Sequence, residues 1–437
     1  MNLHPPGRET LLPGRAVSPS RLYLAEGAAR GLAVGVALAM YGLYVVRDVG
    51  LNPIQLVLLG TGLEVAMFLA EIPTGIVADA FSRRFSVILG FFVTALGWLM
   101  MAAVPSFAVV LAGQMVWGVG ATFGSGAREA WLADEIGEHA AAPLYVRERQ
   151  VFLAAHLCGI PLAVLLGLGS PRLAIVAAGL VHLAMVVALL FSKTEQHWRP
   201  APRGERRAWH HMSDTLRTGV RAVRASPVLL GILAVALFVG MSSEALDRLW
   251  PLHMVEHFDF PPIGGLAEVG WFGVIQFGSI LGALGGVWLA GRVTRLESAV
   301  SIVRTLLVLT VGIMIAALAF ALSDQFWLAL IAFWATDWLR EAAGPLRVAW
   351  VNRGLDPAAR ATVLSMFGQS DSLGQVAGGP ALGVIATIRG VRTALVGVAV
   401  VLAPVLPLYG ILARREGRLE LDLPEGLQRP PGAGTPH

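Results

Sequence analysis

The chain of 437 residues is poor in charged side chains and contains a single cysteine and a single lysine. Charged residues make up 14% of the chain and hydrophobic residues 56%, whereas a water-soluble domain has about 25% charged and roughly 45–50% apolar residues. This composition excludes a water-soluble enzyme, and the excess of hydrophobic residues also excludes intrinsic disorder. With Cys158 alone, the sequence offers no disulfide framework, CxxC redox pair or zinc–thiolate cluster. We predict no metal site and no cofactor.

Long apolar runs make up most of the sequence. A bilayer core of about 30 Å requires roughly 20 mainly apolar residues in helical form. Such runs lie at 22–46, 53–78, 85–104, 107–132, 144–169, 172–192, 228–252, 266–290, 297–322, 326–350, 361–387 and 393–413. The sequence therefore predicts an all-α polytopic membrane protein with twelve transmembrane helices.

The longest hydrophilic stretch divides these runs into two sets of six. The predicted organisation is an N-terminal tail, a first six-helix bundle, a linker, a second six-helix bundle and a C-terminal tail, at 1–21, 22–192, 193–227, 228–413 and 414–437. Within the linker, apolar residues recur every three or four positions from Trp209 to Val223 among arginines. This spacing predicts an amphipathic helix on the anionic inner leaflet, and a solvated linker is the alternative.

The distribution of Lys and Arg predicts the orientation. If the N-terminus is cytoplasmic, the cytoplasmic loops hold 16 of these residues and the outside loops hold four. The positive-inside rule then places both termini in the cytoplasm, as an even number of spans requires. Because the basic residues lie in short clusters between apolar runs, they indicate membrane topology and not nucleic-acid binding. We expect a multi-pass protein of a prokaryotic cytoplasmic (inner) membrane.

The two halves carry traces of an internal repeat. A shift of 219 positions aligns Arg128 and Trp131 with Arg347 and Trp350. Repeats of membrane spans are typical of secondary transporters. The sequence therefore predicts a duplicated six-helix unit.

A loop motif carries a family resemblance. The stretch from Gly75 through Asp79 to Arg83 and Arg84 resembles the G-x-x-x-D-x-x-G-R-R motif of the major facilitator superfamily, with Ser82 in place of the second glycine. Residues 125–135 also resemble the end of the fourth span in prokaryotic members, in a subgroup without an assigned substrate. The resemblance implies that superfamily's fold and transport by alternating access.

The same resemblance implies a conformational latch made of Gly75, Asp79, Arg83, Arg84 and Asp134. Asp79 would hold the cytoplasmic end of the eleventh span, and Arg83 would pair with Asp134. Charge-assisted hydrogen bonds of this kind are strong in a partly dehydrated interface. These contacts would favour the outward-facing state and break when the halves move.

Several ionisable residues fall within the predicted spans, where a charge costs at least about 2.5–3.5 kcal/mol. Arg340 and Glu341 follow Asp337 at i+3 and i+4, so that these three can neutralise one another on one helix. A buried carboxylate can bind a proton near neutral pH. The candidates for substrate binding or proton coupling are Glu64, Glu244, Asp247, Arg248, Asp337, Arg340, Glu341 and Asp371. Structural pairing is the alternative for each group, and we favour it for Glu26 with Arg30.

Glycines and prolines mark two spans. They permit close helix approach and local bending. The residues are Gly159 and Pro161 in the fifth span and Gly378, Gly379, Pro380 and Gly383 in the eleventh.

Together these features predict a secondary active transporter, acting as a monomer in the lipid bilayer, with a small-molecule substrate and protons as its partners. Proton-coupled efflux of small amphipathic or cationic compounds is the favoured function. An importer or uniporter of a small metabolite is the first alternative, and a non-transporting receptor or scaffold on the same fold is the second. An integral-membrane enzyme is disfavoured because the sequence has no HExxH or GxSxG motif. ATP-driven transport is disfavoured because Lys193 does not lie in a glycine-rich phosphate-binding loop.

Overall fold

The computed structural model describes residues 18–192, 226–262, 265, 267–353 and 357–421. The side chains of residues 79–80, 357–359, 361 and 416–421 lie outside this description. The described chain is helical throughout, without a strand, and the predicted amphipathic helix of the linker falls outside the described residues.

The first half consists of six membrane crossings. Their helices are α1 (Pro19–Leu43), extended by the π-helical turn η1 (Tyr44–Asp48), then α2 (Pro53–Ala80), α3 (Arg83–Ala103), α4 (Phe107–Gly124), α5 (Ala127–Ile136), α6 (Glu138–Gly167) and α7 (Pro171–Phe191). Polar N-caps followed by a favourable first turn explain where several of them begin. Asn52, for example, forms a capping box with Gln55 at the start of α2. The helices α4 and α5 form one crossing that is interrupted at Gly126, whose φ of 69° favours glycine.

The second half repeats this pattern. Its helices are α9 (Pro227–His257), α10 (Ala267–Val293), α11 (Ala299–Leu322), α12 (Phe326–Asn352), α13 (Pro357–Arg389), α14 (Val391–Leu402) and α15 (Val405–Leu421). The helices α14 and α15 together form the last crossing. The helix α15 extends into the segment that we predicted as the C-terminal tail.

Ten of the described crossings are long and apolar enough to span a membrane by composition alone. The two that fall short, α12 and α13, are long enough but carry the charged residues singled out in the sequence. Polar side chains are tolerated within a membrane where they face the protein interior. With these two included, the predicted all-α fold of twelve transmembrane helices is confirmed.

The packing of helices is the same in both halves. The first and fifth crossings pack together as α1 with α6 and as α9 with α13, and the third and fourth crossings pack as α3 with α4 and as α11 with α12. Glycine makes the first of these contacts close, because a Cβ on Gly35 would meet the backbone of His156. Gly159 in turn lies against the backbone of Leu32 and Val36. This shared pattern supports the predicted duplication.

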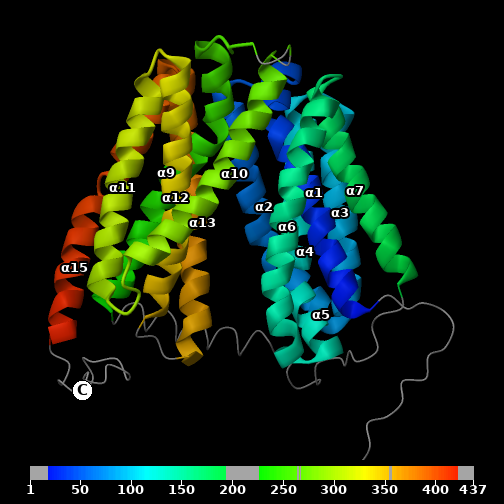
Figure 1. The fold of residues 1–437 in the computed structure, drawn as a ribbon, viewed down its shortest axis with the longest axis horizontal. Helices are drawn as coiled ribbons and strands as arrows, with labels where there is room; N and C mark the ends of the chain where they lie inside the picture. Colours follow the sequence, from blue (N-terminus) through cyan, green and yellow to red (C-terminus); the bar gives the residue numbers. More distant parts are fainter. Residues whose placement is uncertain (1–17, 193–225, 263–264, 266, 354–356, 422–437) are drawn as a thin grey trace, which may run out of the picture.

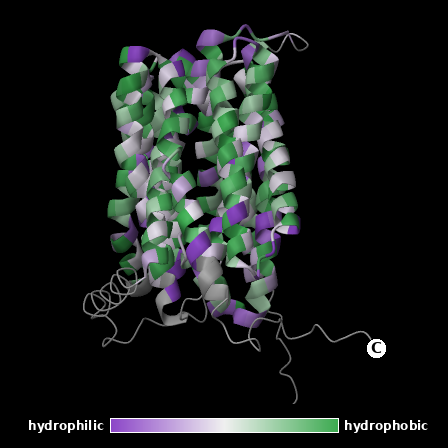
Figure 2. Ribbon diagram, turned by 90° about the vertical axis from the view of Figure 1, so that its left-hand side faces the viewer, coloured by the Kyte–Doolittle hydropathy of each residue, from purple (hydrophilic) through white to green (hydrophobic). Residues whose placement is uncertain are grey.

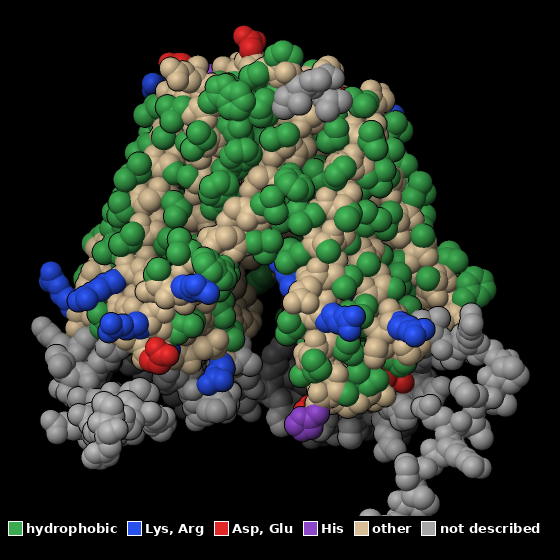
Figure 3. Space-filling model, in the orientation of Figure 1, with side chains coloured by type: hydrophobic (Ala, Val, Ile, Leu, Met, Phe, Trp, Pro, Cys, Tyr) green, Lys and Arg blue, Asp and Glu red, His purple; other side chains and the backbone are tan. Residues whose placement is uncertain are grey.

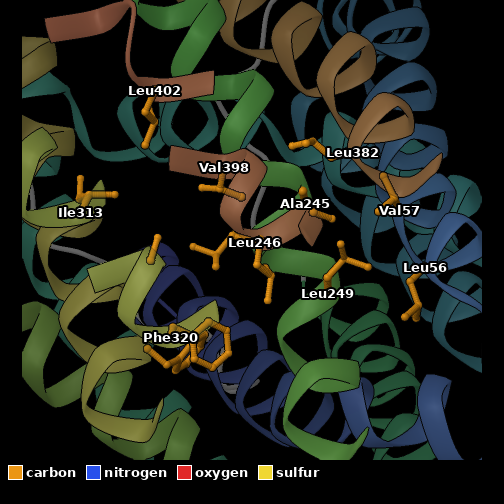
Figure 4. Close-up of a cluster of buried hydrophobic side chains, with 14 of the residues drawn as sticks. Leu56, Val57, Ala245, Leu246, Leu249, Ile313, Phe320, Leu382, Val398 and Leu402 are labelled. Carbon is orange, nitrogen blue, oxygen red and sulfur yellow. The ribbon is translucent and has the colours of Figure 1, made fainter. Parts of the chain in front are cut away.

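The two halves converge at one end of the molecule and separate at the other (Figure 1). We term the end where α1 begins and α15 ends the termini face, and the other end the opposite face. Near the opposite face one hydrophobic core joins the halves, with Leu56 and Val57 of α2 close to Leu249 of α9 and Leu382 of α13 (Figure 4). Toward the termini face, hydrophilic segments are more frequent along the helices (Figure 2).

Candidate functional site

A cleft between the halves opens at the termini face, where the space-filling surface is notched (Figure 3). Part of it is a pocket of about 330 Å³ between α2 and α13. Glu64 and Glu71 of α2 line one side, and Gln369 and Ser372 of α13 line the other. Glu64 accepts a hydrogen bond from the Ser372 hydroxyl at 2.8 Å, which links the two halves. The predicted candidate Glu64 therefore lies where the halves meet.

The wall of the first half contains a cavity of about 420 Å³ with a mainly apolar lining. Phe91, Trp117 and Phe152 contribute aromatic surface to it. Arg30 and Arg128 are the cationic residues of its lining. Aromatic walls with a few charged groups suit an amphipathic ligand.

The wall of the second half contains a smaller and more polar pocket of about 200 Å³. Its charged lining residues are Asp247, Arg340, Glu341, Arg347 and Asp371. Four of these five were predicted from the sequence as candidate site residues, and Arg347 was identified there through the internal repeat. The structure thus brings charges from α9, α12 and α13 into one pocket.

Arg340 forms a bidentate ion pair with Asp247 of α9, at 2.7 Å from Nη1 to Oδ1 and 2.9 Å from Nη2 to Oδ2. Asp337, Arg340 and Glu341 of α12 therefore do not neutralise one another alone, because Arg340 has its ion pair on α9 while it still attracts the other two. The physical reason is that the guanidinium reaches across to α9, where a planar fork meets a carboxylate in good geometry. Asp337 is within hydrogen-bonding reach of Ser279 on α10 instead.

The three charged candidates on α9, Glu244, Asp247 and Arg248, also do not form a single cluster. Arg248 donates from Nε to Glu244 at 2.9 Å, as the i,i+4 spacing suggests. Asp247 instead forms an ion pair with Arg340 of α12. Gly60 of α2 lies so close to Glu244 and Arg248 that a Cβ there would collide with both. The pair therefore packs against the first half.

Asp371 lies on α13 at the polar pocket of the second half. Its Oδ2 accepts a hydrogen bond from Gln375 at 2.9 Å. Within the described residues it makes no ion pair. The backbone of Asp371 lies directly against Gly240 of α9, which leaves no room for a side chain at that glycine.

The predicted latch residues lie at the termini face. Arg83 donates to Asp134 at 2.5 Å and to the Ala130 carbonyl at 3.0 Å. Arg84 donates to the carbonyls of Leu189 and Ser192 at the end of α7. These contacts all stay within the first half, so they remain intact although the cleft is open. Both partners of the Arg83 pair belong to the first half, and the expectation that this pair breaks when the halves move stays a prediction.

Gly75 and Asp79 are the remaining predicted latch residues. Gly75 has open space around it. The side chain of Asp79 lies outside the described residues, so its predicted contact with α13 stays a prediction.

Sequence reasoning missed Glu148, which lies between Arg147 and Arg149 near the start of the predicted span 144–169. In the structure it belongs to α6 and forms an ion pair with Arg30 of α1, and it lies 3.7 Å from Arg128 of α5. This corrects the expected local pairing of Glu26 with Arg30. A signal was present, because Glu148, Phe152, His156 and Gly159 recur at helical spacing on the side of α6 that faces α1.

The glycines of α13 serve two contacts. Gly378 packs on Met241 of α9 within the second half. Gly379 and Gly383 pack on Val57 of α2, in the first half. Pro161 and Pro380 lie inside α6 and α13 respectively.

At the opposite face, Arg47 of η1 forms an ion pair with Glu268 of α10, which joins the two halves. We expect Arg47→Glu to favour separation of the halves at this face, because it places like charges together. An exposed pair contributes about 0.2–1 kcal/mol, so a shift of up to about fivefold is expected. Maleimide labelling of Val57→Cys in a Cys158→Ser background would measure it, since Val57 is buried here between the halves.

The control is the charge-swapped double variant, Arg47→Glu with Glu268→Arg, which should restore the original labelling rate. If Arg47→Glu alone labels like the parent protein, the pair does not hold the halves together.

Comparison with known proteins agrees with this architecture. The family model of the Major Facilitator Superfamily matches residues 27–335. The uncharacterized MFS-type transporter YxaM of Bacillus subtilis (strain 168) is 25% identical over 138 residues, or 32% of this chain and 34% of the relative. The chain is thus matched to about a third of the length of this curated relative.

Solved transporter structures share the fold. The nucleoside transporter NupG superposes with a TM-score of 0.71 at 13% identity, covering 90% of this chain and 98% of NupG. A bacterial homologue of the human lysosomal transporter Spinster, in an inward-facing and unoccupied conformation, superposes with a TM-score of 0.70 at 16% identity, covering 93% and 99%. The family model covers most of the chain and the resemblance seen in the loop motif is confirmed, so the chain is a multi-pass membrane protein that belongs to the Major Facilitator Superfamily.

Proposed function

We propose that the protein is a secondary active transporter that works by alternating access, here with its cleft open to the cytoplasm. The observation that carries the proposal is the asymmetry of the contact between the halves. They are joined near the opposite face by Arg47 with Glu268 and by the core around Val57, while the cleft opens at the termini face. The excess of arginine in the loops at the termini face supports its cytoplasmic orientation.

The substrate that fits this cleft best is a small amphipathic cation. In the first half, Phe91 and Trp117 offer aromatic surface, and the two arginines of that cavity, Arg30 and Arg128, are each paired with a glutamate. The pocket between α2 and α13 has two carboxylates, Glu64 and Glu71, and no basic residue in its lining. Aromatic faces and carboxylates together attract an organic cation. Efflux from the cytoplasm is the direction that we propose for such a substrate.

Proton coupling is assigned to Asp371. Its hydrogen-bond partner Gln375 is neutral, whereas Asp247 and Glu244 are each held by an arginine. Arg340 and Arg347 line the same pocket, but neither forms an ion pair with Asp371 in the described chain, so this carboxylate can exchange a proton for a cationic substrate. The helix α13 contacts both α9 and α2. Protonation of Asp371 on α13 would therefore influence the contact between the halves.

The test is transport by purified protein in liposomes that contain a pH-sensitive dye, with an imposed proton gradient and a panel of cationic dyes and small metabolites. We expect a cationic dye to drive a proton flux that Asp371→Asn abolishes. The matched control is Asp324→Asn, because Asp324 is 81% exposed and lies at the opposite face with Arg392. Substrate movement without proton flux would contradict the coupling and favour a uniporter.

Import of a small metabolite is the second candidate. It is favoured by Arg347, which would complement an anionic group in the polar pocket. The same panel separates the two functions, because a metabolite that moves in place of the dyes would support import. A folded protein that moves neither would support a receptor or scaffold role.

A further inference from the structure

The outer surface of the second half has a long apolar groove that is separate from the cleft. It has a volume of about 540 Å³ and is lined by α10, α11 and α12. Both α10 and α11 pack on α12 but have few contacts with one another in the described chain, so α12 forms the floor. The groove faces the bilayer, since Leu289 and Val293 at its edge are more than half exposed.

The lining offers a ligand almost no hydrogen-bonding group. The Thr305 hydroxyl is bonded to the Ser301 carbonyl at 3.0 Å, and the Trp338 indole N–H is bonded to the Gly278 carbonyl at 3.0 Å. Gly285 faces empty space, with nothing within 4 Å of an added Cβ. Only an apolar chain complements such a surface.

The length of the groove matches one leaflet of a bilayer. Its lining along α10 runs from Gly282 to Val293, which is about 17 Å at the helical rise of roughly 1.5 Å per residue. Half of a hydrocarbon core of about 30 Å is close to this length. A single acyl chain lying along α10 would fill it.

Basic residues lie next in sequence to lining residues at the end of the groove near the termini face. Arg292 lies over the Trp288 ring at 4.2 Å from its centroid, and Arg295 follows in the exposed loop. Arg304 is exposed on α11, one turn before the strongly exposed Val308. Glu297 is the acidic residue of the described loop between α10 and α11. The local excess of positive charge complements a phosphate-bearing headgroup.

We propose that this groove binds one anionic phospholipid, with an acyl chain between α10 and α11 on α12 and its headgroup at Arg292 and Arg304. The site is independent of the transported substrate and of the direction of transport. Because Trp338 forms part of the groove on the same helix as Asp337 and Arg340, a bound lipid supports the helix that carries these cleft charges.

The test is native mass spectrometry of the protein with dioleoyl phosphatidylglycerol or with phosphatidylcholine of the same chains. We expect wild-type protein to retain one molecule of the anionic lipid, preferred by about fivefold for each arginine that reaches the headgroup. Arg292→Gln with Arg304→Gln should reduce this preference to near unity while leaving chain binding intact. Arg389→Gln, at the opposite face, should not change it.

Substitutions that fill the groove test whether it binds the acyl chain of the lipid. Gly285→Phe should lower retention of both lipids severalfold, whereas Gly291→Phe, also in open space on α10 but outside the groove, should retain them as the wild type does. Equal retention of the two lipids by wild type would overturn the proposal, as would unchanged retention in Gly285→Phe. Displacement of the lipid by glycerol 3-phosphate alone would also overturn it, because an anion site would then suffice.

Discussion

Glu148→Gln is expected to destabilise the first half by about 3 kcal/mol or more. The Glu148 side chain is 10% exposed and faces Arg30 on one side and Arg128 on the other. Removing the carboxylate charge leaves the largely buried Arg30 without its ion-pair partner and leaves Arg128 with Glu129 alone, at 3.4 Å. Thermal unfolding in detergent would show the loss as a lower midpoint temperature.

The matched control is Glu138→Gln, because Glu138 is exposed in the first turn of the same helix. It should lower stability by no more than about 1 kcal/mol, through the helix dipole. Adding Arg30→Gln to Glu148→Gln should cost less than the sum of the two single changes, since the pair is removed together. An equal effect of the two glutamate substitutions would show that Glu148 does not balance the arginines.

Gly240→Leu is expected to abolish transport and to lower stability by about 3 kcal/mol. The added side chain would collide with the backbone of Asp371, which cannot move without displacing α13 from α9. Overpacking at a close contact costs about 1–3 kcal/mol and occasionally more. The displacement would also move the carboxylate that we propose for proton coupling. Transport in liposomes and thermal unfolding would be measured on the same preparation.

Gly410→Leu serves as the control, because nothing lies within 4 Å of a Cβ at that position of α15. Gly240→Ala should have an intermediate effect if the distance between the helices is what matters. Wild-type transport by Gly240→Leu would contradict the importance of this contact.

Local chemistry explains which features could be predicted. Hydropathy is a property of each segment and the bilayer demands about 20 apolar residues whatever the fold, so twelve crossings could be found from the sequence. Membrane depth also follows from position along a span, which is why Glu64, Asp247, Arg340, Glu341 and Asp371 could be singled out before the cleft was known. The loop motif placed Arg83 near Asp134 through the family resemblance.

The partners of these charges could not be predicted in the same way. Spacing on one helix suggested that Arg340 pairs with Asp337 and that Arg30 pairs with Glu26, but the ion pairs run to Asp247 and Glu148 on other helices. An arginine side chain is long enough to reach a neighbouring helix, and the choice depends on how the helices are rotated and packed.

The amino-acid sequence by itself determined the membrane class, the number of helices, the duplication and the family, because these follow from hydropathy and from short local motifs. Only the tertiary structure decided which face of the cleft is open, which charges are paired and where the lipid-facing groove lies. These depend on contacts between helices that are far apart in the chain, such as Arg47 with Glu268 and α10 with α12.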